Sequence, residues 1–307
     1  MTASSAPRPR LLLVGGAGGL VGRAVLPEFL PHFRIRSVHR NVARNEGPEV
    51  EWVRADVQRT NDWASLLEGV QVVVNVAWYR WESESSFRTL HDGLCRLIEA
   101  AAGAQVGRFL QVSVPPAPSS LETGLPYLVY KRRVDAALAR SGLSYRIVRP
   151  TMLFGRGDVL LGVMLRLMRR YPFFPMFGDG GFHVSPIAVV DLARVLYLES
   201  QGTDQGTVDL GGPELMTYRE LADRMFRVLA KKARYWRLSE SGARRLTGLM
   251  VALGSTALYP YEAEWLMSDM LGLPAYRGLD RPLAPVGPYL QQITGDVSAP
   301  RAQAARD

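Results

Sequence analysis

The sequence predicts an α/β protein: a doubly wound parallel sheet followed by a smaller, mainly helical C-terminal lobe. Three observations predict this fold. A short apolar run passes into a glycine-dense turn and then into a helical pattern within residues 11–30. Apolar runs then alternate with helical segments as far as residue 210, which is typical of a parallel sheet. From residue 217 onwards the patterns are mainly those of helices.

The glycine-dense turn follows a predicted buried strand at residues 11–14 and precedes a helix. Gly16 permits a tight turn, Gly19 lets backbone amides approach a diphosphate, and Gly22 lets the helix pack close to the strand. The N-terminus of that helix offers unpaired N–H groups and a positive dipole end to an anion. An ordinary glycine-rich loop is the alternative, because this glycine spacing alone is a weak signal. The residues predicted to bind the diphosphate are Gly16, Gly18, Gly19, Leu20, Val21 and Gly22.

The second predicted strand, residues 34–38, ends at His39 and Arg40, with Arg44 close behind. In a dinucleotide-binding fold this strand end reaches the adenosine ribose. A carboxylate there binds the 2′-hydroxyl of NAD, whereas an arginine accommodates the 2′-phosphate of NADP. Residues 39–44 contain no Asp or Glu. A guanidinium matches phosphate geometry, so the sequence favours NADP(H) over NAD(H), the alternative being a solvated arginine at a strand end.

Two further strand ends supply predicted cofactor contacts. After a strand at residues 50–53, Asp56 either bonds the adenine amino group or caps a helix that starts near Asn61. The unbroken apolar run at residues 71–76 predicts a fully buried parallel strand. Ala77 then lets the backbone pass close to a cofactor. The predicted contacts are Asp56, Val57, Asn75, Val76 and Ala77.

The other elements follow in order. In the first part, helices are predicted at residues 85–104, 158–171 and 191–200, and strands at 109–113, 144–148 and 207–210. In the C-terminal lobe, helices are predicted at residues 217–230, 239–253 and 259–271. Thr217 is the expected N-cap of the first of these, with Glu220 completing a capping box. We expect the tail after Leu290 to fray. The side chains expected to pack this lobe are Trp236, Trp265 and Met267.

A tyrosine and a lysine indicate acid–base chemistry. Pro126 suits the first turn of a helix, so Tyr127 and Lys131 share one helical face. An ammonium close to a phenol favours the phenolate, and lowering a tyrosine pKa by about three units needs only ~4 kcal/mol. The alternative is a half-buried aromatic beside a surface lysine. The aromatic stretch at residues 171–177 likewise either lines a substrate pocket or packs in the core.

Together these motifs resemble the short-chain dehydrogenase/reductase superfamily in its extended or atypical branch, which includes NmrA-like proteins and the nucleotide-binding accessory subunit of respiratory complex I. The resemblance implies that Tyr127 exchanges a proton with the substrate oxygen, while Lys131 lowers its pKa and holds the cofactor ribose. It also implies that Pro150, Thr151 and Leu153 lie beneath the nicotinamide. The motifs that carry the resemblance are Gly16/Gly19/Gly22, Asp56-Val57, Asn75-Val76-Ala77, Tyr127/Lys131, Arg149-Pro150 and Gly211-Gly212-Pro213.

The sequence departs from the family pattern at the catalytic serine. The family usually has a serine just after the fifth strand, often within a Ser-Ser pair, but here Ser113 is followed by Val114 and Pro115. Either Ser113 serves, or Ser119 or Ser120 does, or no serine donates to the substrate oxygen. Losing such a donor costs about 10²–10³ in rate, which a protein that binds without turnover would tolerate.

Domain limits follow from these patterns. We expect a Rossmann-type NAD(P)-binding domain at residues 9–212, with 151–185 also contributing to the substrate side, and a smaller lobe at 213–296. Residues 1–8 and 297–307 are expected to be flexible tails.

Composition excludes several classes. The formal net charge is +8, but the basic residues are mostly dispersed arginines, so we predict no nucleic-acid partner. No apolar run approaches the roughly 18 residues of a membrane span. The single cysteine, Cys95, suits a cytoplasmic location. His183 shows no ligand partner in its region, so we predict no metal site.

The sequence therefore predicts an NADP(H)-dependent oxidoreductase that moves a hydride to or from a small carbonyl or alcohol substrate. A non-catalytic NADPH-binding structural or redox-sensing protein of a larger complex is the alternative, and a nucleotide-sugar epimerase or dehydratase is the third. The predicted partners are a small-molecule substrate and either a homodimer mate or a larger complex.

Overall fold

The computed structural model describes residues 8–40, 49–80, 82–158, 160–253 and 260–296. The chain divides into two compact units. The first comprises the chain up to Val114 together with Ser119–Pro150 and Val189–Asp209. The second comprises Pro115–Pro118, Thr151–Ala188 and the chain from Leu210 onwards.

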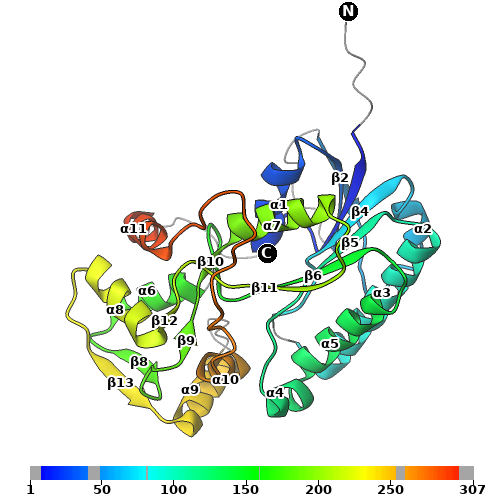
Figure 1. The fold of residues 1–307 in the computed structure, drawn as a ribbon. Coiled ribbons are helices and arrows are strands. Elements are labelled where there is room, and N and C mark those ends of the chain that lie inside the picture. Colours follow the sequence, from blue (N-terminus) through cyan, green and yellow to red (C-terminus); the bar gives the residue numbers. More distant parts are fainter. Residues whose placement is uncertain (1–7, 41–48, 81, 159, 254–259, 297–307) are drawn as a thin grey trace, which may run out of the picture. The chain divides into compact units, whose positions relative to one another are not determined.

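A seven-stranded sheet forms the centre of the first unit, in the order β11-β6-β5-β4-β1-β2-β3 (Figure 1). The six strands from β1 to β6 pair in parallel, which confirms the predicted doubly wound parallel sheet. Strand order reverses beside β1, whose neighbours are β2 and β4, and ligands of such sheets bind at that reversal. The strands are β1 (Arg10–Val14), β2 (Arg34–His39), β3 (Val50–Arg54), β4 (Val70–Asn75), β5 (Arg108–Val112), β6 (Tyr145–Pro150) and β11 (Gly206–Leu210).

Helices cover both faces of this sheet. The long helices α3 and α5 pack against each other, and α1 packs against α7 on the other face (Figure 1). Residues 11–14 of β1 are completely buried between these layers, as their unbroken apolar run predicts. The helices are α1 (Leu20–Phe29), α2 (Trp63–Leu66), α3 (Glu84–Gly103), α4 (Ser119–Gly124), α5 (Pro126–Ala139) and α7 (Val189–Gln201).

The second unit is mainly helical and has its own apolar core. Three two-stranded sheets stiffen it: β10 with β7, β12 with β9 and β13 with β8. Its helices are α6 (Leu160–Arg170), α8 (Tyr218–Val228), α9 (Glu240–Ala252), α10 (Pro260–Met267) and α11 (Val286–Asp296). Its strands are β7 (Leu153–Phe154), β8 (Phe174–Phe177), β9 (His183–Val184), β10 (Ile187–Ala188), β12 (Met216–Thr217) and β13 (Tyr235–Leu238). The predicted capping box is present, because Thr217 Oγ1 accepts from the Glu220 N–H and a Glu220 carboxylate oxygen accepts from the Thr217 N–H.

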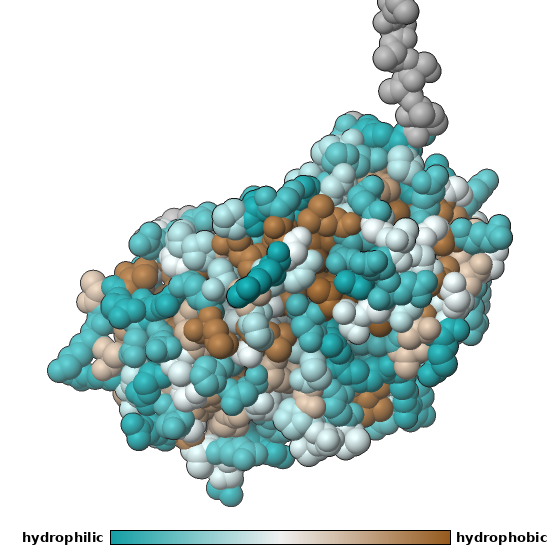
Figure 2. All heavy atoms as spheres, in the orientation of Figure 1, coloured by the Kyte–Doolittle hydropathy of each residue, from teal (hydrophilic) through white to brown (hydrophobic). Residues whose placement is uncertain are grey.

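Two predictions for this unit are wrong. Trp236 does not pack the lobe, because 52% of it is exposed. The chain is not frayed between Leu290 and Asp296, since α11 continues to Asp296 and Leu290 is fully buried; residues 297–307 lie outside the described residues. The reason is a helical apolar spacing, Val286, Leu290 and Ile293, which packs on the core of this unit. On the molecular face drawn in Figure 2, apolar side chains lie in patches among hydrophilic ones.

Candidate functional site

The turn after β1 is shaped by glycines that no other residue could replace without movement. Gly15 and Gly16 have φ values of +103° and +80°, in the region that favours glycine. A Cβ on Gly15 would lie 2.5 Å from the backbone nitrogen of Ala77, and one on Gly16 would lie 2.4 Å from the His39 ring. A Cβ on Gly22 would lie 2.0 Å from the carbonyl oxygen of Gly16. The first turn of α1 therefore packs directly on the glycine turn.

The next part of the turn is open instead of crowded. A Cβ on Gly18 or Gly19 would meet no atom within 4 Å. Gly19 is the N-cap of α1 and supplies no side-chain cap to the helix, whose next residues are Leu20 and Val21. Amides at an uncapped helix N-terminus beside open space suit an anion. The geometry fits the diphosphate of a dinucleotide.

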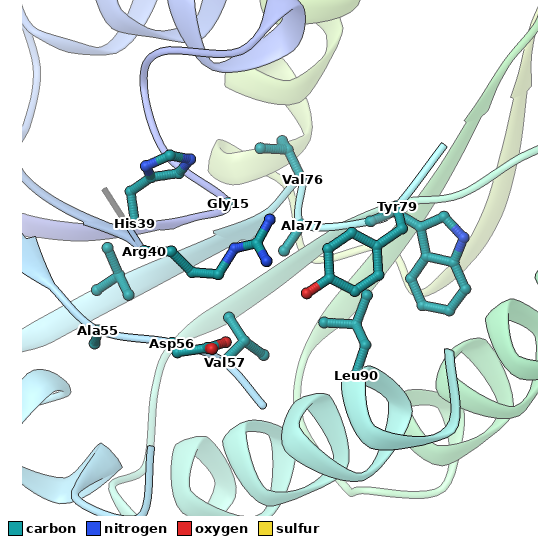
Figure 3. Close-up of a pocket in the computed structure, with 12 residues that line it drawn as sticks. Gly15, His39, Arg40, Ala55, Asp56, Val57, Val76, Ala77, Tyr79 and Leu90 are labelled. Atoms are coloured by element: carbon teal, nitrogen blue, oxygen red, sulfur yellow. The ribbon is translucent and has the colours of Figure 1, made fainter. Parts of the chain in front are cut away.

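A pocket of about 140 Å³ lies at the carboxyl ends of β1, β2 and β4. Figure 3 shows its lining side chains converging from these strand ends, from the segment that follows β3 and from α3. Six predicted residues line it together with Gly15, although the diphosphate and nicotinamide candidates do not. The lining residues are Gly15, Val38, His39, Arg40, Ala55, Asp56, Val57, Val76, Ala77, Trp78, Tyr79 and Leu90.

Arg40 and Tyr79 face each other across this pocket (Figure 3). The Arg40 guanidinium carbon lies 5.1 Å from the centroid of the Tyr79 ring, a cation–π contact. Burial raises the pKa of the Tyr79 hydroxyl; Asp56 and Glu82 raise this pKa further, while Arg40 lowers it. Tyr79 was not predicted, because an aromatic residue after a buried strand carries no motif. Arg44 lies outside the described residues.

Asp56 lines the pocket and does not cap a helix. Its Oδ1 accepts a hydrogen bond from the Gln58 N–H at 3.0 Å, which makes a local turn. The N-cap of α2 is Asp62, whose carboxylate accepts from the Ser65 N–H. The capping alternative for Asp56 is therefore wrong. The helix starts at Trp63, slightly later than expected, because Asp62 is the residue whose carboxylate caps it.

Asn75 fixes the backbone that passes the pocket. It is buried, and its Nδ2 donates to Gln111 Oε1 of β5 at 2.7 Å. Its Oδ1 accepts from the Ala77 N–H at 3.0 Å, while the Val76 N–H donates to the Val14 carbonyl. The side chain thus ties β4 to β5 and sets the turn that brings Ala77 against Gly15.

Tyr127 and Lys131 lie on one face of α5, as the i, i+4 spacing predicts. Both contact the indole of Trp78, a pocket residue that was not predicted. The Lys131 Nζ lies 4.5 Å from that ring centroid, and the Tyr127 ring packs on it edge to face at 5.9 Å. Phe87 of α3 contacts both aromatic rings. Lys131 is only 3% exposed, so the alternative of a surface lysine is wrong.

Burial sets the protonation of Lys131. The pKa of this ammonium is lowered from its usual value to about 7, mainly by burial; the Asp135 carboxylate raises this pKa and Arg132 lowers it, and both effects are included in that value. Asp135 lies one further turn along the same face of α5. Burial raises the pKa of Asp135, opposed by the Ser113 hydrogen bond and by the charges of Lys131 and Arg132.

Ser113 donates its hydroxyl hydrogen to Asp135. The distance from Ser113 Oγ to Asp135 Oδ2 is 2.5 Å, and Ser113 is 2% exposed. Arg132 lies 3.5 Å from the same carboxylate and 2.9 Å from Glu122 of α4. Ser113 thus contacts the buried charges of α5. The other two predicted serines, Ser119 and Ser120, are exposed on α4.

The three residues predicted beneath the nicotinamide fall in both units. Pro150 ends β6 in the first unit, whereas Thr151 and Leu153 belong to the second. The Thr151 hydroxyl donates to the Ser185 carbonyl at 2.5 Å, so its contact is to backbone. Across the described ranges no cluster of three or more His, Cys, Asp or Glu side chains could hold a metal. In the same part of the chain no helix is long and apolar enough to cross a membrane.

Comparisons with known proteins agree with this geometry. Residues 16–162 match the NAD(P)H-binding family. The chain is 27% identical over 180 residues to the mitochondrial NADH dehydrogenase (ubiquinone) 1 alpha subcomplex subunit 9 of Arabidopsis thaliana, covering 57% of this chain and 44% of that protein. It is 27% identical over 216 residues to a ceramide reductase of Caulobacter vibrioides, covering 69% of this chain and 67% of that protein.

A solved structure supports the fold. A nucleoside-diphosphate-sugar epimerase from Staphylococcus aureus superposes with a TM-score of 0.73 at 16% identity, over 92% of this chain and 99% of that one. The chain spans less than half of the Arabidopsis relative, 44% of its length. The fold class and the family resemblance predicted from the sequence are therefore confirmed.

Proposed function

We propose that this chain, whose residues 16–162 match the NAD(P)H-binding family, is an NADP(H)-dependent oxidoreductase of the atypical or extended short-chain dehydrogenase/reductase type, acting on small carbonyl or alcohol substrates. One observation carries the proposal. Tyr127 and Lys131 meet on the indole of Trp78, and the same indole lines the pocket at the strand ends. An acid–base pair thus adjoins a pocket that fits part of a dinucleotide.

The glycine turn and α1 would hold the diphosphate of the cofactor. His39 and Arg40 at the end of β2 would meet the adenosine ribose, and the exposed guanidinium of Arg40 is suited to a 2′-phosphate. Residue 39 and its described neighbours at the end of β2 include no carboxylate that would bind a free 2′-hydroxyl. This arrangement supports NADP(H) over NAD(H). Asp56 in the pocket wall would face the adenine.

The chemistry needs one proton and one hydride. NADP(H), when bound, would supply or accept the hydride. Tyr127 would donate a proton to the substrate oxygen during reduction and accept one during oxidation. A charged Lys131 would favour the phenolate of Tyr127 by electrostatic attraction and would also bind the ribose. Ser113 would act indirectly, through its bond to Asp135.

Replacing Tyr127 with Phe tests the catalytic role. Purified protein is assayed for NADPH oxidation against a panel of aldehydes and ketones, and for NADPH binding by fluorescence. We expect Tyr127→Phe to lower turnover at least 100-fold with little change in NADPH affinity, since acid–base catalysis contributes about 10²–10⁴. Tyr130→Phe is the matched control, because Tyr130 contacts Arg88 and Glu84 instead. Unchanged turnover in Tyr127→Phe contradicts the proposal.

A non-catalytic NADPH-binding protein is the second candidate. It is favoured by the bond from Ser113 to Asp135, which commits the hydroxyl to a carboxylate and not to a substrate. The Arabidopsis relative, named as a subunit of a larger enzyme, is consistent with docking on a complex. Tight NADPH binding with no reduction of any carbonyl in the panel would favour this candidate.

An epimerase or dehydratase that retains its cofactor is the third candidate, since the Staphylococcus structure with a similar fold is named an epimerase. Product analysis with nucleotide sugars distinguishes it from a net reductase.

The single cysteine supports the proposed cytoplasmic location. A homodimer is proposed as well, and the elution volume of the purified protein on gel filtration tests it.

A further inference from the structure

Two segments of the second unit, residues 166–178 and 227–239, lie side by side. Strands β8 and β13 pair in parallel, as Figure 1 shows. The Phe174 N–H donates to the Arg234 carbonyl at 2.9 Å. Lys231 Nζ donates to the carbonyls of Met168 at 2.8 Å and Arg169 at 2.5 Å. The two segments therefore present one continuous surface within this unit.

Large aromatic side chains are exposed on this surface. Tyr171, Phe173 and Trp236 are 47%, 45% and 52% exposed, although Phe174 and Phe177 of the same strand region are buried. Phe173 and Trp236 pack edge to face with ring centroids 6.1 Å apart. Grouped aromatic side chains in water mark an interaction site more often than single exposed ones do.

The same surface is strongly positive. The first segment contains three arginines and the second contains five Arg or Lys residues, and neither segment contains an Asp or Glu. The carboxylates next to these segments already have partners: Asp223 accepts from the Tyr235 hydroxyl, Asp179 accepts from the Gly181 N–H, and Glu240 pairs with Arg244. We call the exposed part of this surface the basic aromatic patch; it consists of Arg170, Tyr171, Phe173, Lys232, Arg234 and Trp236.

We propose that the basic aromatic patch docks this protein on an anionic lipid bilayer. Aromatic rings are favoured at the level of lipid headgroups, and cations beside them are attracted to an anionic leaflet. A single-stranded nucleic acid needs open ring faces for stacking bases. Here the Arg170 guanidinium covers the Tyr171 ring at 5.5 Å, and Phe173 and Trp236 use an edge and a face against each other. These contacts favour the bilayer.

Co-sedimentation of the full chain with vesicles tests the proposal. Vesicles of phosphatidylcholine alone are compared with vesicles that contain 30% phosphatidylglycerol, at low and at high salt. We expect binding to the anionic vesicles only, and a loss of that binding at high salt because surface charges are screened. A blue shift of tryptophan fluorescence on binding is expected, and Trp236→Ser should abolish it.

Charge variants make the test specific to the patch. Removing two cations with Lys232→Gln and Arg234→Gln should weaken vesicle binding by about 30-fold. The matched control is Arg244→Gln with Arg245→Gln, which removes the same charge from α9 of the same unit. Circular dichroism shows that each variant is folded. Absence of binding to anionic vesicles, or equal binding of the two double variants, overturns the proposal. So does patch-dependent binding of a single-stranded oligonucleotide in place of vesicles.

Discussion

Replacing Asp135 with Asn should lower the pKa of Lys131, so that its side chain is charged less often near neutral pH. Asn keeps the size of the side chain and can still accept the hydrogen bond from Ser113. It removes the negative charge that raises the pKa of Lys131 against the lowering effect of burial. The pKa of Lys131 is about 7 with Asp135 in place. A nearby opposite charge shifts a pKa by about 1–3 units, each worth ~1.4 kcal/mol. We therefore expect Asp135→Asn to lower the pKa of Lys131 by at least about one unit.

The effect on charge is large at the working pH. At pH 7.5 a lysine with a pKa near 7 is charged roughly one quarter of the time, and a drop of about one unit reduces this to roughly 3%. If charged Lys131 is needed for turnover, activity falls as the pH rises through this pKa. The falling limb of the pH profile should therefore move to lower pH in Asp135→Asn.

Nuclear magnetic resonance measures this pKa without a substrate. The chain has only three lysines, Lys131, Lys231 and Lys232, so ¹³Cε-labelled lysine gives three signals that single Lys→Arg variants assign. Glu122→Gln is the control, because Glu122 pairs with Arg132 and not with Lys131. An unchanged or raised pKa of Lys131 in Asp135→Asn would refute the argument. This result is independent of whether the protein catalyses a reaction.

Three further predictions follow from the same geometry. Arg40→Ala should weaken NADPH binding about 10–100-fold with little change for NADH, since a charge-assisted phosphate contact is worth roughly 1.5–3 kcal/mol. Fluorescence titration measures both affinities. Equal losses for the two cofactors would contradict the proposed contact between Arg40 and the 2′-phosphate. Gly22→Ala should abolish cofactor binding and lower Tm, because its Cβ would lie 2.0 Å from a backbone oxygen, whereas Gly18→Ala, which meets nothing within 4 Å, should fold normally. The free energy of unfolding in urea should rise between pH 7 and pH 9, because the lowered pKa of Lys131 in the folded protein means that the unfolded chain binds more protons in this range. Lys131→Gln should reduce this rise by about 1–2 kcal/mol. An equal rise in both proteins would contradict the lowered pKa of Lys131.

Long elements could be predicted from the sequence because their patterns are local. The strand at residues 11–14 and the helix beginning at Leu20 follow from an apolar run and from turn chemistry, and both lie where expected. The two-residue strands β7, β9, β10 and β12 were not predicted, since alternation cannot be recognised over two residues. Helix α11 was missed because its apolar spacing is interrupted by small and polar side chains. Packing on the apolar core of the second unit is what stabilises this helix.

The residues of the candidate site also differ in whether the sequence alone could predict them. The glycine turn and the Tyr127/Lys131 spacing are local motifs, so sequence reasoning found them. Trp78 and Tyr79 were missed, because their importance arises from side chains that arrive from β2 and α5. Asp135 offered a signal that was not used: it stands eight residues after Tyr127, on the same face of the helix. A carboxylate at that spacing beside a buried lysine predicts a charge partner.

The altered sequence after β5 acquires a physical explanation from Asp135. A buried carboxylate beside a buried ammonium is costly unless further hydrogen bonds satisfy its oxygens. Ser113 Oγ supplies one such bond at 2.5 Å, and Arg132 supplies positive charge at 3.5 Å, while the Arg132 NH1 group also donates to the Val114 carbonyl at 2.8 Å. The backbone that follows the serine therefore takes part in holding the same charges. In this chain the strand-end hydroxyl of Ser113 is hydrogen-bonded to Asp135 on the helix that carries Lys131, and we propose that the serine acts on the site through this carboxylate.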